Sequence, residues 1–225
     1  MIHLPAPSFV DFHTHYSGCD KYVNRPEVFV VQSCMWGIDT IHPRANAVTL
    51  GIHPMQRDAA ELMGRYSGDL LAEDFQNFCD RISVPVIGIG ECGWDRRSTL
   101  NPEEQDKLVS LQADLAIRLS LPLILHNVGA THKVLALRKS LPQNCEIWHH
   151  GFRSKAEIYT QLLDAGVHIS LHPKASQNLQ VTADLFRQGF LRLETDDEEV
   201  PVNSLYSEWA ARLEVDPADL LVDSL

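Results

Sequence analysis

Hydrophobic residues in this chain occur in short runs, and longer segments with a helical period separate them. Eight of the runs predict strands: 8–13, 28–33, 47–53, 85–91, 122–127, 145–150, 167–172 and 190–195. Most of them are continuously apolar rather than alternating, which is typical of parallel strands that are covered on both faces.

Helix signals mark three of the segments between these runs. Residues 57–82 predict a helical region that glycines interrupt. The other two segments, 101–119 and 154–166, each begin with a polar residue and a glutamate three positions later, which predicts a capping box: Asn101 with Glu104, and Ser154 with Glu157. The first two interstrand segments are short and poorly helical, so we expect irregular connections there.

Alternation of eight strands with helices predicts a parallel sheet, and eight is the strand number that closes a (β/α) barrel. We therefore expect an α/β protein of the TIM-barrel type, compact at 225 residues. No linker, repeat or low-complexity tract indicates a second domain, so one barrel domain is predicted over residues 1–225.

Composition restricts the class of protein further. The chain is 44% hydrophobic and 22% charged, as expected for a globular protein. It contains no apolar run long enough for a membrane span, and its first residues do not resemble a signal peptide. Five scattered cysteines without a CxxC pair indicate reduced thiols, and we expect a cytoplasmic protein. A net charge of -11 excludes a broad electropositive surface for duplex DNA.

Candidate chemistry first appears in the stretch "VDFHTHY", residues 10–16, where Asp11, His13 and His15 alternate with other residues. In an extended strand such side chains share one face. Good metal ligands also stand at or just after the ends of other predicted strands: Glu91, His126, His150 and Asp196. Barrel enzymes build their active sites at this rim, from the C-terminal ends of several strands.

Each of these residues has a simpler interpretation when it is considered alone. A histidine near a strand end is usually a hydrogen-bonded or exposed side chain. Glu91 also suits the start of a helix, where the dipole favours an acid, and Asp196 lies in the acidic run "ETDDEE". Six potential ligands at one rim nevertheless favour a metal site.

The motifs resemble those of the TatD family of metal-dependent hydrolases, within the amidohydrolase-like barrels. They occur in the family's order: "DFHTH" (11–15), "GIHP" (51–54), "GIGECGWD" (88–95), "LPLILHN" (121–127), "HGF" (150–152) and "ETD" (194–196). The resemblance implies a barrel fold and hydrolysis of phosphodiesters, chiefly in DNA. It also implies ligands for two metal ions: His13, His15 and Asp196 for one ion, His126 and His150 for the other, and Glu91 bridging both.

Several positions around the expected substrate mouth depart from the family pattern: "HNVGA" after the fifth strand, "HGFRS" after the sixth and "DDEEVP" after the eighth. These departures bear on the substrate. We therefore keep two alternatives: a hydrolase of an amide, ester or aminoacyl bond on the same metals, and a metal-binding module without catalysis.

Other polar residues near the rim are predicted to support the metal ligands or to contact substrate. Asp11 is expected to anchor the backbone or to support a ligand, and Asp95 to orient substrate or to form a structural ion pair. His53, in "GIHP", is a possible addition to the site, and His149 is expected on the opposite strand face from His150 or in supporting contact. The cationic candidates for phosphate contact are Arg96, Arg97, Arg153 and Lys155.

The donor set indicates the kind of cation and substrate. Mixed imidazole and carboxylate ligands suit zinc, manganese or iron better than magnesium alone, and we expect two divalent ions that are zinc, manganese or magnesium. Two such ions lower the pKa of a bridging water and stabilise charge on a phosphoryl group. Against Glu91 and Asp196 they leave a local charge of roughly +2, which attracts an anion despite the acidic chain. Glu91 and Asp196 are therefore the predicted catalytic residues, and a phosphoester or nucleic-acid end is the predicted substrate.

Overall fold

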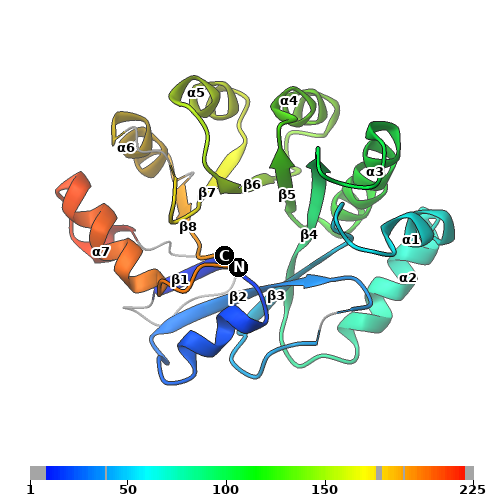
Figure 1. Cartoon of the computed structure of the whole chain (residues 1–225), viewed down its shortest axis with the longest axis horizontal. Coiled ribbons are helices and arrows are strands. Elements are labelled where there is room, and N and C mark those ends of the chain that lie inside the picture. The colour runs from blue at the N-terminus through cyan, green and yellow to red at the C-terminus, as the bar shows by residue number, and fades with distance from the viewer. Residues whose placement is uncertain (1–8, 39, 176–178, 190, 221–225) are drawn as a thin grey trace.

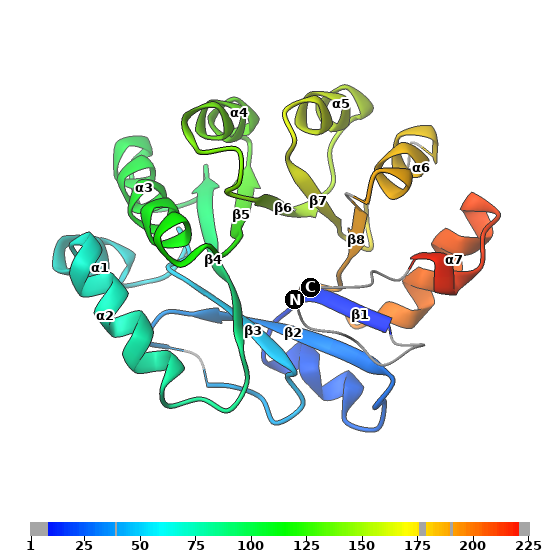
Figure 2. The same ribbon diagram turned by 180° about the vertical axis from the view of Figure 1, so that it is seen from behind.

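A computed structural model of the chain describes residues 9–38, 40–175, 179–189 and 191–220. Eight parallel strands follow one another in a single sheet, in the order β1 to β8. Figure 1 and the reverse view in Figure 2 show these strands as a ring with the helices outside it. The predicted TIM-type (β/α) barrel is therefore confirmed.

All eight predicted strands are present, with small shifts at their ends. Their bounds are β1 Phe9–Thr14, β2 Val28–Met35, β3 Ala47–Gly51, β4 Val86–Asp95, β5 Leu123–Val128, β6 Ile147–Phe152, β7 His168–Leu171 and β8 Leu191–Leu193. The predictions for residues 8 and 190 lie outside the described residues.

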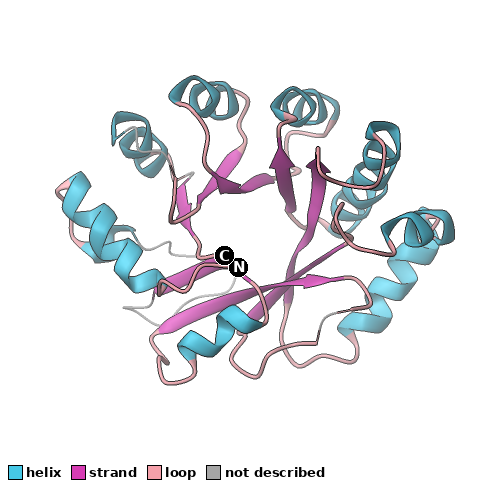
Figure 3. Cartoon of the chain, in the orientation of Figure 1, coloured by secondary structure: helices cyan, strands magenta, loops and turns pink. Residues whose placement is uncertain are grey.

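Seven α-helices of the described chain cover the outside of the strands (Figure 3). They are α1 Ala59–Arg65, α2 Gly68–Cys79, α3 Pro102–Leu119, α4 Thr131–Ser140, α5 Ala156–Asp164, α6 Leu179–Arg187 and α7 Val202–Leu213, with 3-10 helices at Ser17–Tyr22 and Pro217–Leu220. Within the described residues, no helix has both the length and the apolar character that a bilayer crossing requires.

Helix starts confirm one capping prediction and correct another. Asn101 caps α3, its side chain accepting from two backbone N–H groups while Glu104 bonds back to the Asn101 N–H, which is the predicted capping box. The box predicted from Ser154 and Glu157 is wrong. The helix begins one residue later than that box requires, so Lys155 occupies the cap position and makes no side-chain cap bond.

The early connections are irregular, as expected. β1 and β2 are joined through the 3-10 helix Ser17–Tyr22, and the described part of the β2–β3 connection contains no helix. The helical segment 57–82 is divided into α1 and α2 by Tyr66 and Ser67, between the two glycines that predicted a break.

Closure of the ring depends on a few contacts between the first and last strands. The carbonyl of His13 accepts the backbone N–H of Asp196 at 2.8 Å, and Thr14 forms a parallel bridge with Asp196. The residues that follow β8 are thereby held beside the C-terminal end of β1. The packed core lies between the ring and the helices and includes Leu108 and Leu115 of α3 and Ile89 of β4, all buried.

Candidate metal centre

Four histidine rings converge on one buried carboxylate at the C-terminal rim of the barrel. Glu91 Oε2 lies 3.1 Å from His13 Nε2. Its Oε1 lies 2.6 Å from His150 Nε2, 2.8 Å from His126 Nδ1 and 3.2 Å from His53 Nε2. Glu91 is 5% exposed, so these contacts are largely withdrawn from water.

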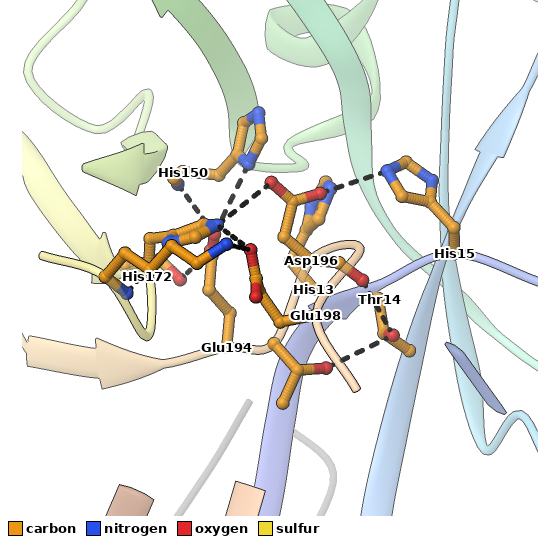
Figure 4. Close-up of polar contacts among 12 residues, drawn as sticks. His13, Thr14, His15, His150, His172, Glu194, Asp196 and Glu198 are labelled. Atoms are coloured by element: carbon orange, nitrogen blue, oxygen red, sulfur yellow. Dashed lines mark hydrogen bonds and ion pairs between the residues drawn. The ribbon is translucent and has the colours of Figure 1, made fainter. Parts of the chain in front are cut away.

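A second carboxylate, Asp196, lies close to His13 and His15. Its Oδ1 is 3.1 Å from His15 Nε2, and its Oδ2 is 3.9 Å from His172 Nε2. Figure 4 shows Asp196 between the rings of His15 and His172. Because single nitrogen and oxygen atoms of His13, His15 and Asp196 all lie within 4.8 Å of one another, this trio could hold one cation.

The barrel architecture explains how distant residues meet. His13, Glu91, His126 and His150 stand on β1, β4, β5 and β6. His15 directly follows β1, and Asp196 lies in the segment after the end of β8 at Leu193. Parallel strands place their C-terminal ends at one rim. The structure thus brings together all six residues that the sequence nominates, and their function as metal ligands stays a prediction.

Two further carboxylates support the histidine rings from behind. Asp95 Oδ2 accepts from His126 Nε2 at 3.0 Å and is paired with the Arg97 guanidinium at 2.6 Å. Glu194 lies 3.5 Å from His150 Nδ1 and accepts the hydroxyl of Ser170. Carboxylates in this position fix the tautomer and orientation of a metal-binding imidazole and raise its basicity.

Asp11 anchors the segment that carries the HxH pair, as predicted. Its Oδ1 accepts the backbone N–H of Thr195 at 3.0 Å and that of His13 at 3.4 Å. Its Oδ2 accepts the hydroxyl of Tyr22 at 2.7 Å. Asp11 is fully buried, and its bonds to Thr195 hold β1 and the residues after β8 together.

Electrostatics in the site favour ionised carboxylates. Burial raises the pKa of Glu91, but the charges of His150 and His13, together with the hydrogen bond from His126, outweigh burial and hold this pKa well below its usual range. Burial likewise raises the pKa of Asp196, but its hydrogen bond to His15 and the charges of His13 and His150 together outweigh burial and lower this pKa. Both acids are therefore available as anionic ligands at neutral pH.

Unsatisfied nitrogen atoms show that these residues fit a divalent cation. His13 is 1% exposed, and neither of its ring nitrogens makes a hydrogen bond among the described residues, although Nε2 lies 3.1 Å from Glu91 Oε2. Its ring also stacks on that of His150, with 4.1 Å between centroids. Buried polar atoms normally have a partner, and imidazole with carboxylate oxygen is a donor set that zinc and manganese accept.

His53 lies inside the cluster, but its hydrogen bonds differ from those of a ligand. Its Nδ1 accepts the backbone N–H of Met55 at 3.0 Å. An amide N–H can only donate, so the ring hydrogen must be on Nε2, which therefore points a donor at Glu91. His53 thus joins the site as a hydrogen-bond donor, although its Nε2 lies within reach of a cation at Glu91 and His126.

Sequence reasoning missed two residues of the site, Glu194 and His172. The sequence held a signal for each position: Glu194 is the first residue of the "ETD" motif, and His172 ends the predicted strand 167–172 at the same rim. Both are buried, at 0% and 1% exposure.

The remaining predictions near the rim have mixed outcomes. His149 is buried on the opposite strand face from His150, where its Nε2 accepts from Asn127 Nδ2 at 3.0 Å. Of the cationic candidates, Arg97 is committed to Asp95. Arg96, Arg153 and Lys155 are exposed and stay candidates for contact with an anionic substrate.

Comparison with known proteins identifies the family. The sequence model of the family described as "TatD related DNase" matches residues 10–204, which include all six nominated residues. The chain belongs to the TatD family. Membership confirms the resemblance found in the motifs and the expected class, a metal-dependent hydrolase.

TatD relatives show how far the similarity extends. The uncharacterized metal-dependent hydrolase YjjV of Escherichia coli (strain K12) is 31% identical over 198 residues, 78% of this chain and 72% of that protein. The 3'-5' ssDNA/RNA exonuclease TatD of Pectobacterium parmentieri is 36% identical over 90 residues, which are 40% of this chain and 31% of that enzyme.

Solved structures agree on the fold. A TatD family hydrolase from Entamoeba histolytica superposes with a TM-score of 0.74 at 16% identity, covering 96% of this chain and 95% of that one. The E. coli YjjV structure gives 0.69 at 20% identity, with coverage of 94% and 93%. Both confirm that this chain folds as a TatD-type barrel.

Proposed function

We propose that this TatD protein is a two-metal phosphodiesterase that cleaves the end of a single-stranded nucleic acid or a nucleotide ester. The convergence of four histidines on Glu91, beside the pair of His15 and Asp196, carries the proposal. The name of the Pectobacterium relative, a 3'-5' ssDNA/RNA exonuclease, supports the substrate class.

The proposed ligand sets follow the distances in the site. His13, His15 and Asp196 would hold one cation, His126 and His150 the other, and Glu91 would lie between the two. Zinc or manganese suits these donors best, and magnesium is the third candidate. Divalent ions in such a pair activate a water molecule and neutralise phosphoryl charge.

Residues of the chain itself would orient the site. Asp95 and Glu194 hold the rings of His126 and His150, so that the ring nitrogens facing Glu91 keep their lone pairs free. His53 directs its Nε2–H at the same point, where it can donate to a bound oxyanion once cations occupy the lone pairs of Glu91.

The charge of the chain limits the form of the substrate. With a net charge of -11, the surface repels a long polyanion, whereas the metal centre attracts one phosphate locally. A strand end or a small ester is therefore favoured over a duplex. Arg153, exposed after β6, is a candidate for contact with the next phosphate along a strand.

The experiment combines metal analysis with a substrate panel. Protein purified without added ions would be assayed for bound metals. It would then be tested on a single-stranded oligonucleotide, a matching duplex, a dinucleotide, and ester, amide and aminoacyl substrates. We expect about two metal equivalents, since two ligand sets are present, and cleavage of the single strand and the dinucleotide.

Variants connect the activity to the site. Glu91→Gln removes the central carboxylate charge and should abolish one metal equivalent together with cleavage, whereas Glu73→Gln, at an exposed position of α2, should change neither. Cleavage of acyl substrates only would replace this proposal with the acyl-hydrolase alternative. Bound metal without any turnover would indicate a binding module.

A further inference from the structure

Three histidines in this chain are followed by proline: His42, His53 and His172. In each case the backbone N–H two residues later donates to Nδ1 of the histidine, at 3.1, 3.0 and 3.0 Å respectively. The three turns therefore share one geometry. Because an amide N–H cannot accept, Nδ1 must be unprotonated in each ring, and the ring hydrogen of the neutral side chain is on Nε2.

Two of these fixed donors have an acceptor within the protein. His42 Nε2 donates to Asp20 Oδ1 at 3.2 Å, away from the metal centre. His53 Nε2 lies 3.2 Å from Glu91 Oε1. The geometry of the turn thus produces an Nε2–H donor that pairs with an anionic oxygen.

His172 carries the same donor without an acceptor. Its side chain is 1% exposed, and its Nε2 has no hydrogen-bond partner among the described residues. The closest carboxylate oxygens, on Asp196 and Glu198, are both 3.9 Å away, which is too far for a hydrogen bond (Figure 4). Glu198 is already paired with Lys174. A buried donor that points into a site without a partner indicates an acceptor supplied by a ligand.

Metal coordination does not explain this nitrogen. His172 lies near enough to Asp196 and Asp197 for the three to group around a cation. A ligand nitrogen needs a free lone pair, however, and the lone pair of Nδ1 is used by the Lys174 N–H while Nε2 carries hydrogen. His172 therefore offers a donor at this rim.

We propose that His172 binds the substrate, its Nε2–H donating to a non-bridging phosphoryl oxygen held beside Asp196. This inference rests on the proposed phosphodiesterase function and deepens it, because it assigns a phosphate contact at the β7 end of the site. His172 and His53 would then both donate hydrogen bonds to one phosphoryl group, from different parts of the rim, since they follow β7 and β3.

The test uses substitutions that keep the turn and remove the donor. In His172→Asn the shorter side chain still offers a carbonyl to the Lys174 N–H, as in an Asx-turn, but nothing replaces Nε2–H. His42→Asn makes the same change in the matched turn outside the metal centre. His172→Gln places an amide N–H near the lost position and should restore part of the contact.

Binding of inorganic phosphate and of a deoxynucleoside 5′-monophosphate would be measured by calorimetry on metal-loaded proteins, with metal content determined in parallel. Loss of a hydrogen bond to a charged group predicts about ten- to hundredfold weaker binding by His172→Asn. We expect unchanged metal content in this variant, intermediate binding by His172→Gln and wild-type binding by His42→Asn.

Nitrogen-15 NMR of the histidine rings gives a readout that does not depend on turnover. We expect Nε2 of His172 to stay protonated when metal is added. Loss of that proton on metal addition would make His172 a ligand and overturn the inference. Wild-type phosphate affinity in His172→Asn would also overturn it, leaving the proposed function intact. If the metal-loaded wild-type protein binds neither phosphate probe, the proposed function fails together with the inference.

Discussion

Asp95 gives the sharpest test of how the ring of His126 is held. Its carboxylate accepts from His126 Nε2 at 3.0 Å and from the Arg97 backbone N–H and guanidinium at 2.8 and 2.6 Å. The perturbation is Asp95→Asn, which keeps the size of the side chain. If the amide oxygen stays on the Arg97 N–H, the amide NH2 group faces His126 Nε2.

The substitution thereby exchanges the donor and acceptor nitrogens of the His126 ring. His126 Nε2 must then accept, so the ring hydrogen moves to Nδ1, the nitrogen that lies 2.8 Å from Glu91 Oε1. A protonated Nδ1 cannot bind a cation. Loss of such supporting contacts costs about 10- to 100-fold in metal affinity, which corresponds to about 1.4–2.8 kcal/mol.

The assay is a calorimetric titration of metal-free protein with Zn²⁺ or Mn²⁺, accompanied by thermal unfolding with and without metal. For a chain of this size we expect the stabilisation by metal to shrink by about 3–10 °C in the variant. Asp20→Asn is the matched control, because Asp20 also accepts from a histidine Nε2 but at His42, outside the centre. Wild-type metal affinity in a folded Asp95→Asn protein would refute the ligand role of His126.

Three further predictions concern the metals, the thiols and the backbone. Removal of metal by a chelator should lower the unfolding free energy by about 2.7 kcal/mol relative to protein at a hundredfold excess over Kd, and an unchanged calorimetric midpoint would contradict a bound metal. Cys79 is the one half-buried cysteine, and the other four are buried, so mass spectrometry after mild alkylation should find Cys79 modified first. Gly93→Ala should cost roughly 2 kcal/mol or more in urea unfolding, because Gly93 has a φ of +144° and a Cβ there would lie 1.9 Å from the His126 carbonyl oxygen. Gly64→Ala, within α1 and with open space around it, is the control and should be neutral or stabilising.

The strands could be predicted because burial on both faces leaves a direct trace in the sequence. Continuous apolar runs identified all eight, whereas their ends moved by a few residues because the pairing of neighbours decides where a strand stops. The failed cap of α5 has a local cause. Ser154 and Glu157 have the correct spacing, but the helix starts at Ala156, and a sequence pattern does not fix the helix start to one residue.

The six nominated residues were predictable because each lies at or just after the end of a predicted strand, and parallel strands share a rim. Glu194 and His172 were missed for different reasons. The family resemblance assigns only Asp196 of the "ETD" motif as a metal ligand, so Glu194 of the same motif was not nominated. His172 looked like an ordinary histidine, since nothing in a sequence shows that a ring nitrogen is buried without a partner.

The tautomer of each histidine ring could not be predicted from the sequence for a similar reason. It depends on whether Nδ1 meets a backbone N–H, and only coordinates show that contact. His53 illustrates the point, because its position in "GIHP" suggested membership of the site while its bond from Met55 indicates a donor.

The contact between His15 and Asp196 joins residues 181 positions apart in the chain. A cation bound by these two side chains would link the end of β1 to the segment after β8, much as a covalent cross-link closes a long loop. The ring would then be unable to part at the β8–β1 seam without releasing its ion. Metal binding would in this way stabilise the closed barrel against opening between β8 and β1.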